Sequence, residues 1–287
     1  MDCRRGLHLV LGICAIFLPV TQDPHDTGVA ESPPEWLCTV GDYFIEDYQR
    51  LPPKQQNEFV ESYRQKYSSA LRQALDELRA LHSDTSFQVL GRLKSVPSIR
   101  EKIVRKKYRC FSELTDIAGT RLVIADYAAL PLVTERIERH FFVREKQDLM
   151  RDEEKTGYRA IHYLAWVDGR VVEIQIHTRR GTLWAEASHR LVFKGPFADN
   201  QALVSYLRRL SQAIFLLDSG LQGQIPQAPE ALPAEARKIL TETIADILAV
   251  GKRSVDGSID SHSPKDSLPD FFALDEFGTL RFGAARP

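Results

Sequence analysis

The sequence is poor in cysteine and methionine, and it has almost no net charge. Its 287 residues include four cysteines and two methionines, and 38 Lys or Arg against 39 Asp or Glu give a formal net charge of −1. The cysteines, Cys3, Cys14, Cys38 and Cys110, form neither a C-x-x-C pair nor a metal-ligand spacing, and they are too sparse for a disulfide framework, so we interpret them as free thiols. The balanced charge gives no general reason to expect a nucleic-acid partner.

The N-terminus contains an apolar run that is too short to cross a bilayer. This run, from Leu7 to Val20, has the length of a signal-peptide core, and Arg4 and Arg5 precede it. A weak cleavage pattern, Gly28-Val29-Ala30, follows it rather late. An upstream start codon or an ordinary extension explains the same residues equally well. We therefore expect residues 1–35 to be a signal-like or disordered N-terminal extension, with no stable membrane association.

The order of the predicted elements indicates a mixed α/β fold. Apolar residues at three- and four-residue spacing predict one long amphipathic helix over Lys54 to His82. The later patterns predict strands over Phe87–Leu93, Thr120–Ala125 and Phe141–Lys146, and helices over Ala128–His140, Leu183–Phe193, Ala202–Leu217 and Ala234–Val250. We expect a mixed sheet flanked by helices (α/β, of the α+β kind). It would occupy residues 40–225, followed by a C-terminal helix at 226–252 and by a linker with an aromatic, acidic tail at 253–287.

Asp168-Gly169 lies between two runs rich in β-forming residues, which predicts a two-residue hairpin turn. Because the turn fixes the register, each side chain can be assigned to a face. The predicted apolar face pairs Ile161 with Ile176, Tyr163 with Ile174 and Ala165 with Val172. The opposite face pairs Leu164 with Glu173, His162 with Gln175 and Ala160 with His177. Polar groups thus gather on one wall of the hairpin, where a binding cleft would need them.

Positive charge is concentrated in one segment. Residues 92–109 hold eight Lys or Arg and one acidic residue, Glu101. Here a strand is followed by a helix that we expect to open with a capping box at Ser98–Glu101, after an extended Pro97. Free N–H groups in a first helical turn, close to basic side chains, suit a polyphosphate. A charge run of this kind is also a common solvated helix face, so taken alone it leaves both interpretations open.

Five short motifs follow one another between residues 85 and 195. They are Arg92-Leu93-Lys94-Ser95 with Ser98 and Lys102, Asp116–Arg121, Gly157–His162, Val172–Thr178, and Trp184-Ala185-Glu186 with His189 and Lys194. In this order they resemble the motifs of the RelA/SpoT (p)ppGpp synthetase domain, whose core is nucleotidyltransferase-like. The chain has no room for the hydrolase and regulatory domains of bifunctional members, and its one His-Asp pair, His25-Asp26, lies in the predicted linker. It therefore resembles the small stand-alone synthetases.

The resemblance implies an ATP site and a magnesium site. Arg92 and Arg121 would flank the adenine, and the phosphates would be held by Lys94, Ser95, Ser98 and Lys102. Asp116 and Glu173 would be the catalytic carboxylates. Both would be metal ligands for Mg²⁺, and Glu173 would also activate the 3′-hydroxyl of the acceptor. Without the family, Asp116 fits a helix-terminal cap better.

On the acceptor side the resemblance implies contacts from Lys155, Tyr158, His162 and Gln175, with Tyr158 stacking on the base. This side departs from the family twice. Glu154 stands where the family usually has a lysine, and His177 stands where many members have arginine. Because both departures fall on the acceptor side, the acceptor is less well defined than the ATP site.

The resemblance implies transfer of the β,γ-diphosphate of ATP to GDP or GTP, which makes (p)ppGpp in the stringent response and releases AMP. Toxic small members of the family make (p)ppApp or pyrophosphorylate the 3′ end of tRNA, and a non-catalytic nucleotide- or RNA-binding module is a third alternative. Because the implied reaction consumes ATP, we expect a cytoplasmic location for the protein. The signal-like N-terminus leaves export as an alternative. Small members often form homo-oligomers, so we expect that an oligomer is possible here too.

Overall fold

The computed structural model describes residues 42–150 and 157–252 of the chain. The expectations for the N-terminal extension, for the C-terminal tail, and for Glu154 and Lys155 lie outside these residues. No helix in the described part of the chain combines the length and the apolar character that crossing a membrane requires.

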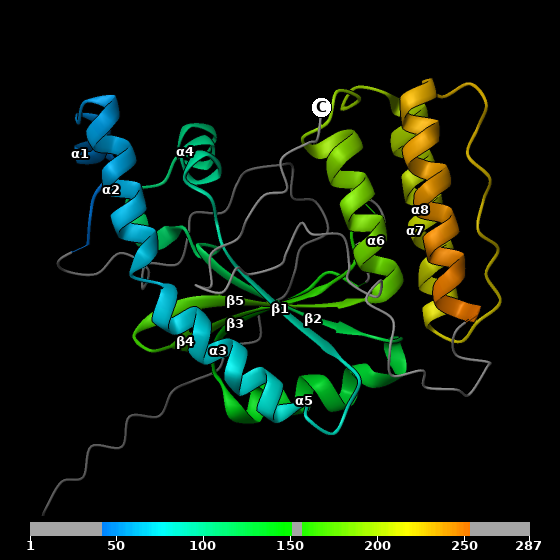
Figure 1. Cartoon of the computed structure of the whole chain (residues 1–287), viewed down its shortest axis with the longest axis horizontal. Helices are drawn as coiled ribbons and strands as arrows, with labels where there is room; N and C mark the ends of the chain where they lie inside the picture. The colour runs from blue at the N-terminus through cyan, green and yellow to red at the C-terminus, as the bar shows by residue number, and fades with distance from the viewer. Residues whose placement is uncertain (1–41, 151–156, 253–287) are drawn as a thin grey trace, which may run out of the picture. The chain divides into compact units, whose positions relative to one another are not determined.

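A five-stranded mixed sheet forms the centre of the described chain (Figure 1). Its strands are β1 (Gln88–Leu93), β2 (Ala118–Ile124), β3 (Phe142–Asp148), β4 (Ile161–Val167) and β5 (Arg170–Thr178), in the order β1-β2-β5-β4-β3. The central pair, β2 and β5, runs parallel, and every other pair is antiparallel. The predicted mixed sheet flanked by helices is confirmed.

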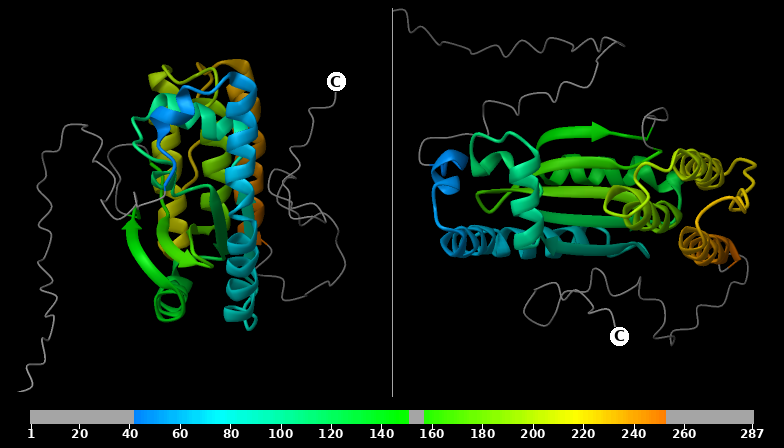
Figure 2. Two further views of the ribbon diagram at one scale, coloured as in Figure 1. Left: turned by 90° about the vertical axis from the view of Figure 1, so that its left-hand side faces the viewer. Right: turned by 90° about the horizontal axis from the view of Figure 1, so that it is seen from above.

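Eight α-helices surround the sheet within the described residues. They are α1 (Ile45–Gln49), α2 (Pro53–Gln65), α3 (Ser68–Leu81), α4 (Val96–Arg105), α5 (Leu130–His140), α6 (Arg179–Ser188), α7 (Gln201–Asp218) and α8 (Ala234–Lys252). The apolar sides of α3 and α5 pack on one face of the sheet, where Leu78, Ile137 and Ile174 are fully buried. A second core joins α6, α7 and α8 through Trp184 and neighbouring leucines, and Figure 2 shows these three helices grouped at one end of the sheet.

The hairpin is formed as its sequence predicts. Ile161 lies opposite Ile176, His162 opposite Gln175, and Leu164 opposite Glu173. Asp168 and Gly169 both have positive φ, at 45° and 69°, as a type I′ turn requires. The register therefore places the hairpin's apolar face in the core and its polar face on the open side of the sheet.

The long helix predicted over Lys54 to His82 is wrong, because the chain breaks between α2 and α3. At the break, the N–H groups of Lys66 and Tyr67 donate to carbonyls three residues back, which is a tighter turn than in an α-helix. Tyr67 is buried there, with its ring centroid 5.7 Å from that of Tyr63 and 5.4 Å from the Arg170 guanidinium. The anchored tyrosine lets α2 pack beside α4 while α3 lies on the sheet.

The capping box predicted at Ser98 is also wrong. Helix α4 begins at Val96, and the Ser95 side chain caps it by accepting a hydrogen bond from the Ser98 N–H at 3.4 Å. Pro97 lies in the first turn, where a missing N–H costs no hydrogen bond. Helix α6 similarly begins four residues before the predicted Leu183, because Thr178 caps it by accepting from the Gly181 N–H at 2.9 Å.

Cys110 corrects the interpretation of the cysteines as free thiols. It is the one cysteine among the described residues, and it is fully buried and disulfide-bonded. Spacing along a sequence does not reveal cysteines that the fold brings together, so this bond left no signal in the pattern.

Replacing Gly169 by alanine tests whether the turn stabilises the hairpin. Apart from its two chain neighbours, no described residue has an atom within 4 Å of a Cβ built on Gly169, so the cost arises from the left-handed backbone. We expect Gly169→Ala to lower the free energy of unfolding by roughly 1–2 kcal/mol, measured by urea denaturation. Asp168→Asn is the matched control, because asparagine adopts this conformation readily and should leave stability unchanged. Equal stability of Gly169→Ala and the wild type would contradict the assignment.

Candidate active site

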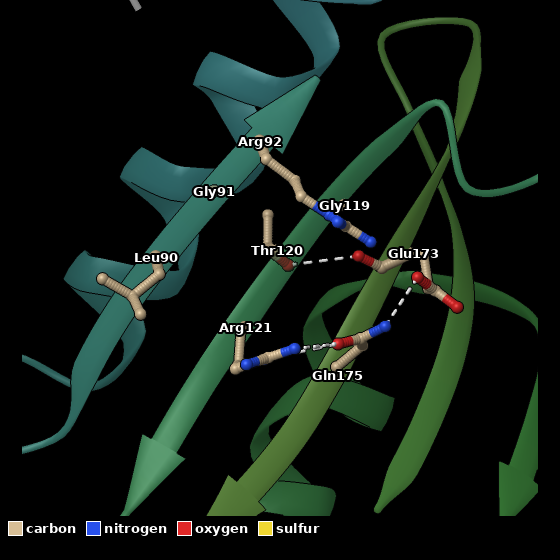
Figure 3. Close-up of a pocket in the computed structure, with 8 residues that line it drawn as sticks. All are labelled: Leu90, Gly91, Arg92, Gly119, Thr120, Arg121, Glu173 and Gln175. Carbon is tan, nitrogen blue, oxygen red and sulfur yellow. Dashed lines mark hydrogen bonds between the residues drawn. The ribbon is translucent and has the colours of Figure 1, made fainter. Parts of the chain in front are cut away.

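The face of the sheet opposite α3 carries polar side chains in two rows across the central strands. The strand registers align Arg92 with Gly119 and Glu173 in one row, and Leu90 with Arg121, Gln175 and His162 in the other. Figure 3 shows the members of these rows that lie on β1, β2 and β5 side by side: Leu90, Arg92, Gly119, Arg121, Glu173 and Gln175. The alternation of each strand therefore brings basic, amide and acidic groups from distant parts of the sequence onto one surface.

Asp116 is held between two lysines at the edge of this surface. The Lys94 N–H donates to the Ile117 carbonyl at 2.8 Å, which extends the β1–β2 ladder and brings the two segments together. The Lys94 ammonium donates to Asp116 Oδ2 at 2.6 Å, and Lys102 Nζ pairs with Asp116 Oδ1 at 2.8 Å. Lys94, Lys102 and Asp116 are each less than a fifth exposed, so the three charges form a largely buried cluster.

The cluster keeps its aspartate ionised despite its burial. Burial favours the neutral carboxyl, but the charges of Lys102 and Lys94 hold the pKa of Asp116 well below its usual range. Burial also lowers the pKa of Lys94, whereas attraction to Asp116 outweighs burial and raises the pKa of Lys102. One carboxylate thus pairs with two cations, one just before the Ser95 cap of α4 and one in the last turn of that helix, and the cluster keeps a net positive charge.

Glu173 is held by a neighbour on each side. The Gln175 amide donates to Glu173 Oε2 at 2.8 Å, and the Gln175 carbonyl accepts from Arg121 at 3.3 and 3.4 Å (Figure 3). On the other side, His162 Nδ1 lies 3.4 Å from Glu173 Oε1. The carboxylate is about 15% exposed. It is oriented by both neighbours and still accessible, as a general base needs to be.

Tyr158 joins two imidazoles beside Glu173. Its hydroxyl lies 2.9 Å from His162 Nε2 and 3.0 Å from His177 Nε2. Burial lowers the pKa of His162, and it lowers the pKa of His177 far more, since that ring is almost fully enclosed. Burial raises the pKa of the Tyr158 hydroxyl as well. All three groups are therefore neutral at physiological pH.

A cavity of about 570 Å³ opens between the sheet and α6, which is large enough for a nucleotide. Burial raises the pKa of Glu186, a carboxyl in its wall. The cavity is lined by Arg92, Arg121, Tyr158, Gln175, Trp184, Ala185, Glu186, Ser188, His189, Arg190 and Phe193. Arginines, aromatic rings and a carboxyl in one cavity can hold a planar base and a charged group together.

The predicted site residues thus fall into three groups on one face of the fold. Lys94, Ser95, Ser98, Lys102 and Asp116 lie on or next to α4; Arg92, Arg121, Glu173 and Gln175 lie across the strands; and Tyr158 and His162 lie beside Glu173. Lys155 lies outside the described residues. Two features were missed, namely the contact of His177 with Tyr158 and the placement of Glu186 in the cavity wall. Only the departure at His177 hinted at the first.

The described residues contain no group of three His, Cys, Asp or Glu side chains that could hold a metal ion. Asp116 and Glu173 nevertheless offer the hard carboxylate oxygens that Mg²⁺ prefers, and Mg²⁺ in nucleotide sites usually takes its other ligands from phosphates and water. The donor chemistry therefore fits a magnesium ion that arrives together with a nucleotide.

Residues 91–196 match the family described as "Region found in RelA / SpoT proteins". Among solved structures, small alarmone synthetase 1 from Bacillus subtilis bound to its product pppGpp is 29% identical, over 58% of this chain and 94% of that one, with a TM-score of 0.48. Small alarmone synthetase 2 from Bacillus subtilis is 22% identical, over 56% and 94%, also at 0.48. A GTP pyrophosphokinase family protein from Streptococcus pneumoniae is 20% identical, over 66% and 96%, at 0.48. No curated protein matches the chain.

The acid dependence of stability tests the charge cluster. The lowered pKa of Asp116 means that its stabilising effect is complete above the usual carboxyl pKa of 3.8 and is lost as the pH falls toward the folded-state pKa. In metal-free buffer at pH 7, we expect Asp116→Asn to cost about 3–5 kcal/mol in urea denaturation, because two buried lysines lose their counter-charge. The difference from wild type should narrow as the pH falls below the usual pKa.

Asp84→Asn is the control for this experiment. Asp84 also pairs with one basic residue, Arg136, at 2.6 Å, but it is exposed to solvent. Water screens such a pair, so its loss should change stability much less. An Asp116→Asn protein as stable as Asp84→Asn at pH 7 would show that the lysines do not depend on Asp116.

Proposed function

We propose that this protein is a Mg²⁺-dependent pyrophosphokinase. The proposal starts from the match of residues 91–196 to the RelA/SpoT family. The protein transfers the β,γ-diphosphate of ATP to the 3′-hydroxyl of GDP or GTP, makes (p)ppGpp and releases AMP. One observation carries the proposal. A lysine–aspartate cluster beside α4 and an oriented glutamate lie on the same open face of the sheet.

The ATP side of this reaction needs cations that can turn to phosphate. Lys94 and Lys102 now neutralise Asp116, and a triphosphate would offer them the same negative charge. The first-turn N–H groups of α4, with Ser95 and Ser98, would add hydrogen bonds to the phosphates. Arg92 and Arg121 line the cavity beside this cluster, where their guanidinium planes would stack on adenine.

Asp116, released from the lysines, and Glu173 would hold Mg²⁺ against the bound phosphates. The ion would supply positive charge that offsets the charge developing on the phosphates during transfer. The chain's own contribution is mostly positioning, which supplies much of the rate in phosphoryl transfer.

Glu173 is the residue we assign as the base. It would accept the proton of the acceptor 3′-hydroxyl as that oxygen attacks the β-phosphorus of ATP, and the bond from the β-phosphorus to the oxygen bridging it to the α-phosphorus would break to release AMP. Gln175 and His162 keep the carboxylate in place from either side. Tyr158 in the cavity wall gives the acceptor base an aromatic surface, and Lys155 would contact the acceptor.

A transfer assay tests this function. We would incubate the protein with γ-labelled ATP and Mg²⁺ and offer GDP, GTP, AMP, ADP, ATP and tRNA as separate acceptors. We expect label on GDP or GTP. Label on an adenosine nucleotide or on tRNA would replace the guanosine acceptor by that of the toxic small synthetases, and no transfer to any acceptor would overturn the enzyme in favour of a nucleotide- or RNA-binding module.

Glu173→Gln tests the base in the same assay. The amide keeps the size of the side chain but cannot take a proton, so we expect transfer to fall by about two to four orders of magnitude while ATP binding, measured by calorimetry, is retained. Glu145→Gln is the matched control, since Glu145 is an exposed glutamate on β3. Wild-type transfer by Glu173→Gln would contradict the assignment.

A further inference from the structure

Four side chains form a continuous series that leads from a fully buried ring to the proposed base. His177 Nε2 lies 3.0 Å from the Tyr158 hydroxyl, the same hydroxyl lies 2.9 Å from His162 Nε2, and His162 Nδ1 lies 3.4 Å from Glu173 Oε1. His177 is 2% exposed, so it cannot touch the solvent or a large substrate. Its effect on the reaction must therefore pass through Tyr158.

The chemistry of these groups gives the series a direction. His177 Nδ1 is buried and has no hydrogen-bond partner among the described residues, so the proton of the neutral His177 ring is favoured on Nε2, which donates to the Tyr158 hydroxyl. That hydroxyl then donates its own proton to His162 Nε2. The proton of the neutral His162 ring is therefore left on Nδ1, the nitrogen that lies 3.4 Å from Glu173 Oε1.

The reverse direction is disfavoured at both ends. It would turn a lone pair of His162 Nδ1 toward the Glu173 carboxylate, and it would place a proton on His177 Nδ1. That nitrogen is buried and has no hydrogen-bond partner within the described part of the chain, and an unsatisfied buried N–H costs more than an unsatisfied lone pair. The two ends therefore favour the same direction.

We infer that His177 is a positioning residue that fixes the tautomer of His162 through the Tyr158 hydroxyl, and so fixes the orientation of Glu173. This inference rests on the proposed role of Glu173 as the base. The series forms the second support of the carboxylate, opposite the Arg121–Gln175 pair. It also engages the Tyr158 hydroxyl.

The tautomer of His162 is the direct test, and it needs no activity. In protein labelled with ¹⁵N-histidine, NMR shifts distinguish a protonated Nδ1 from a protonated Nε2, and the His162 signals are identified by their loss in His162→Asn. We expect protonated Nδ1 in the wild type and in His177→Gln, whose amide N–H can replace the Nε2 donor. We expect a mixture of tautomers in His177→Leu and in Tyr158→Phe.

Tyr163→Phe is the matched control, because it removes a hydroxyl from the neighbouring residue of β4. Tyr163 lies on the opposite face of the sheet, where its hydroxyl donates to Glu138 at 2.8 Å. The His162 signals should stay at their wild-type positions in this variant. The inference would be overturned by unchanged His162 signals in Tyr158→Phe, or by a wild type whose His162 is protonated on Nε2. If His177→Leu fails to fold, Tyr158→Phe still provides the test.

Kinetics separate positioning from binding. We expect Tyr158→Phe and His177→Leu each to lower kcat by about ten- to a hundredfold, in the range seen when a supporting hydrogen bond is removed, with the KM for the acceptor nearly unchanged because the aromatic ring remains. The double variant should lose no more than either single one, and His177→Gln should restore kcat. Additive losses, or a change in KM alone, would contradict the series. A wild type that transfers no label fails the proposed function, while the NMR result still stands or falls by itself.

Discussion

Strands β2 and β5 run parallel at the centre of the sheet, with Gly119 opposite Glu173 and Arg121 opposite Gln175. This pairing determines which polar side chains lie next to one another on the open face of the sheet. It lies between β1, which supplies Arg92, and β4, which supplies His162, so one register sets the neighbours of the glutamate on both sides. Gly119 has no side chain to separate Arg92 from Glu173, and a Cβ there would lie 3.7 Å from Glu173 Oε2. Slipping β5 by one residue would turn Glu173 into the core.

Under the proposed function, the charge pairs on this face are ones that a bound nucleotide would replace. Burying one carboxylate between two ammonium groups avoids the cost of an unpaired buried charge, but it holds the lysines in place only as long as nothing more negative arrives. A triphosphate carries more charge than one carboxylate, and a divalent cation is a better partner for Asp116 than a lysine is. The exchange conserves the number of favourable pairs, so substrate binding would rearrange the cluster without leaving a bare charge.

Sequence reasoning succeeded where the determining interactions are local. The Asp168-Gly169 turn and the alternation of β4 and β5 fixed the hairpin register, since both depend on neighbouring residues. It failed where a contact between residues far apart in the sequence determines the local structure. The break at Lys66–Tyr67 depends on the packing of Tyr67 against Tyr63 and Arg170, and the start of α4 depends on which of two serines caps it. The pairing of Asp116 with two lysines had no local signal, because the β1–β2 ladder joins segments more than twenty residues apart.

The surroundings of His177 favour a neutral histidine over an arginine at this position. An arginine there would bring a permanent positive charge and several donors to the Tyr158 hydroxyl, whereas an imidazole brings one donor and can stay neutral when it is fully buried. Arg121 already supplies positive charge on this face and itself contributes to lowering the pKa of His177. A second cation would therefore be repelled, and a neutral donor satisfies the hydroxyl at lower cost. An arginine at this position would thus hold Tyr158 and Glu173 differently while leaving the carboxylate and the aromatic ring in place.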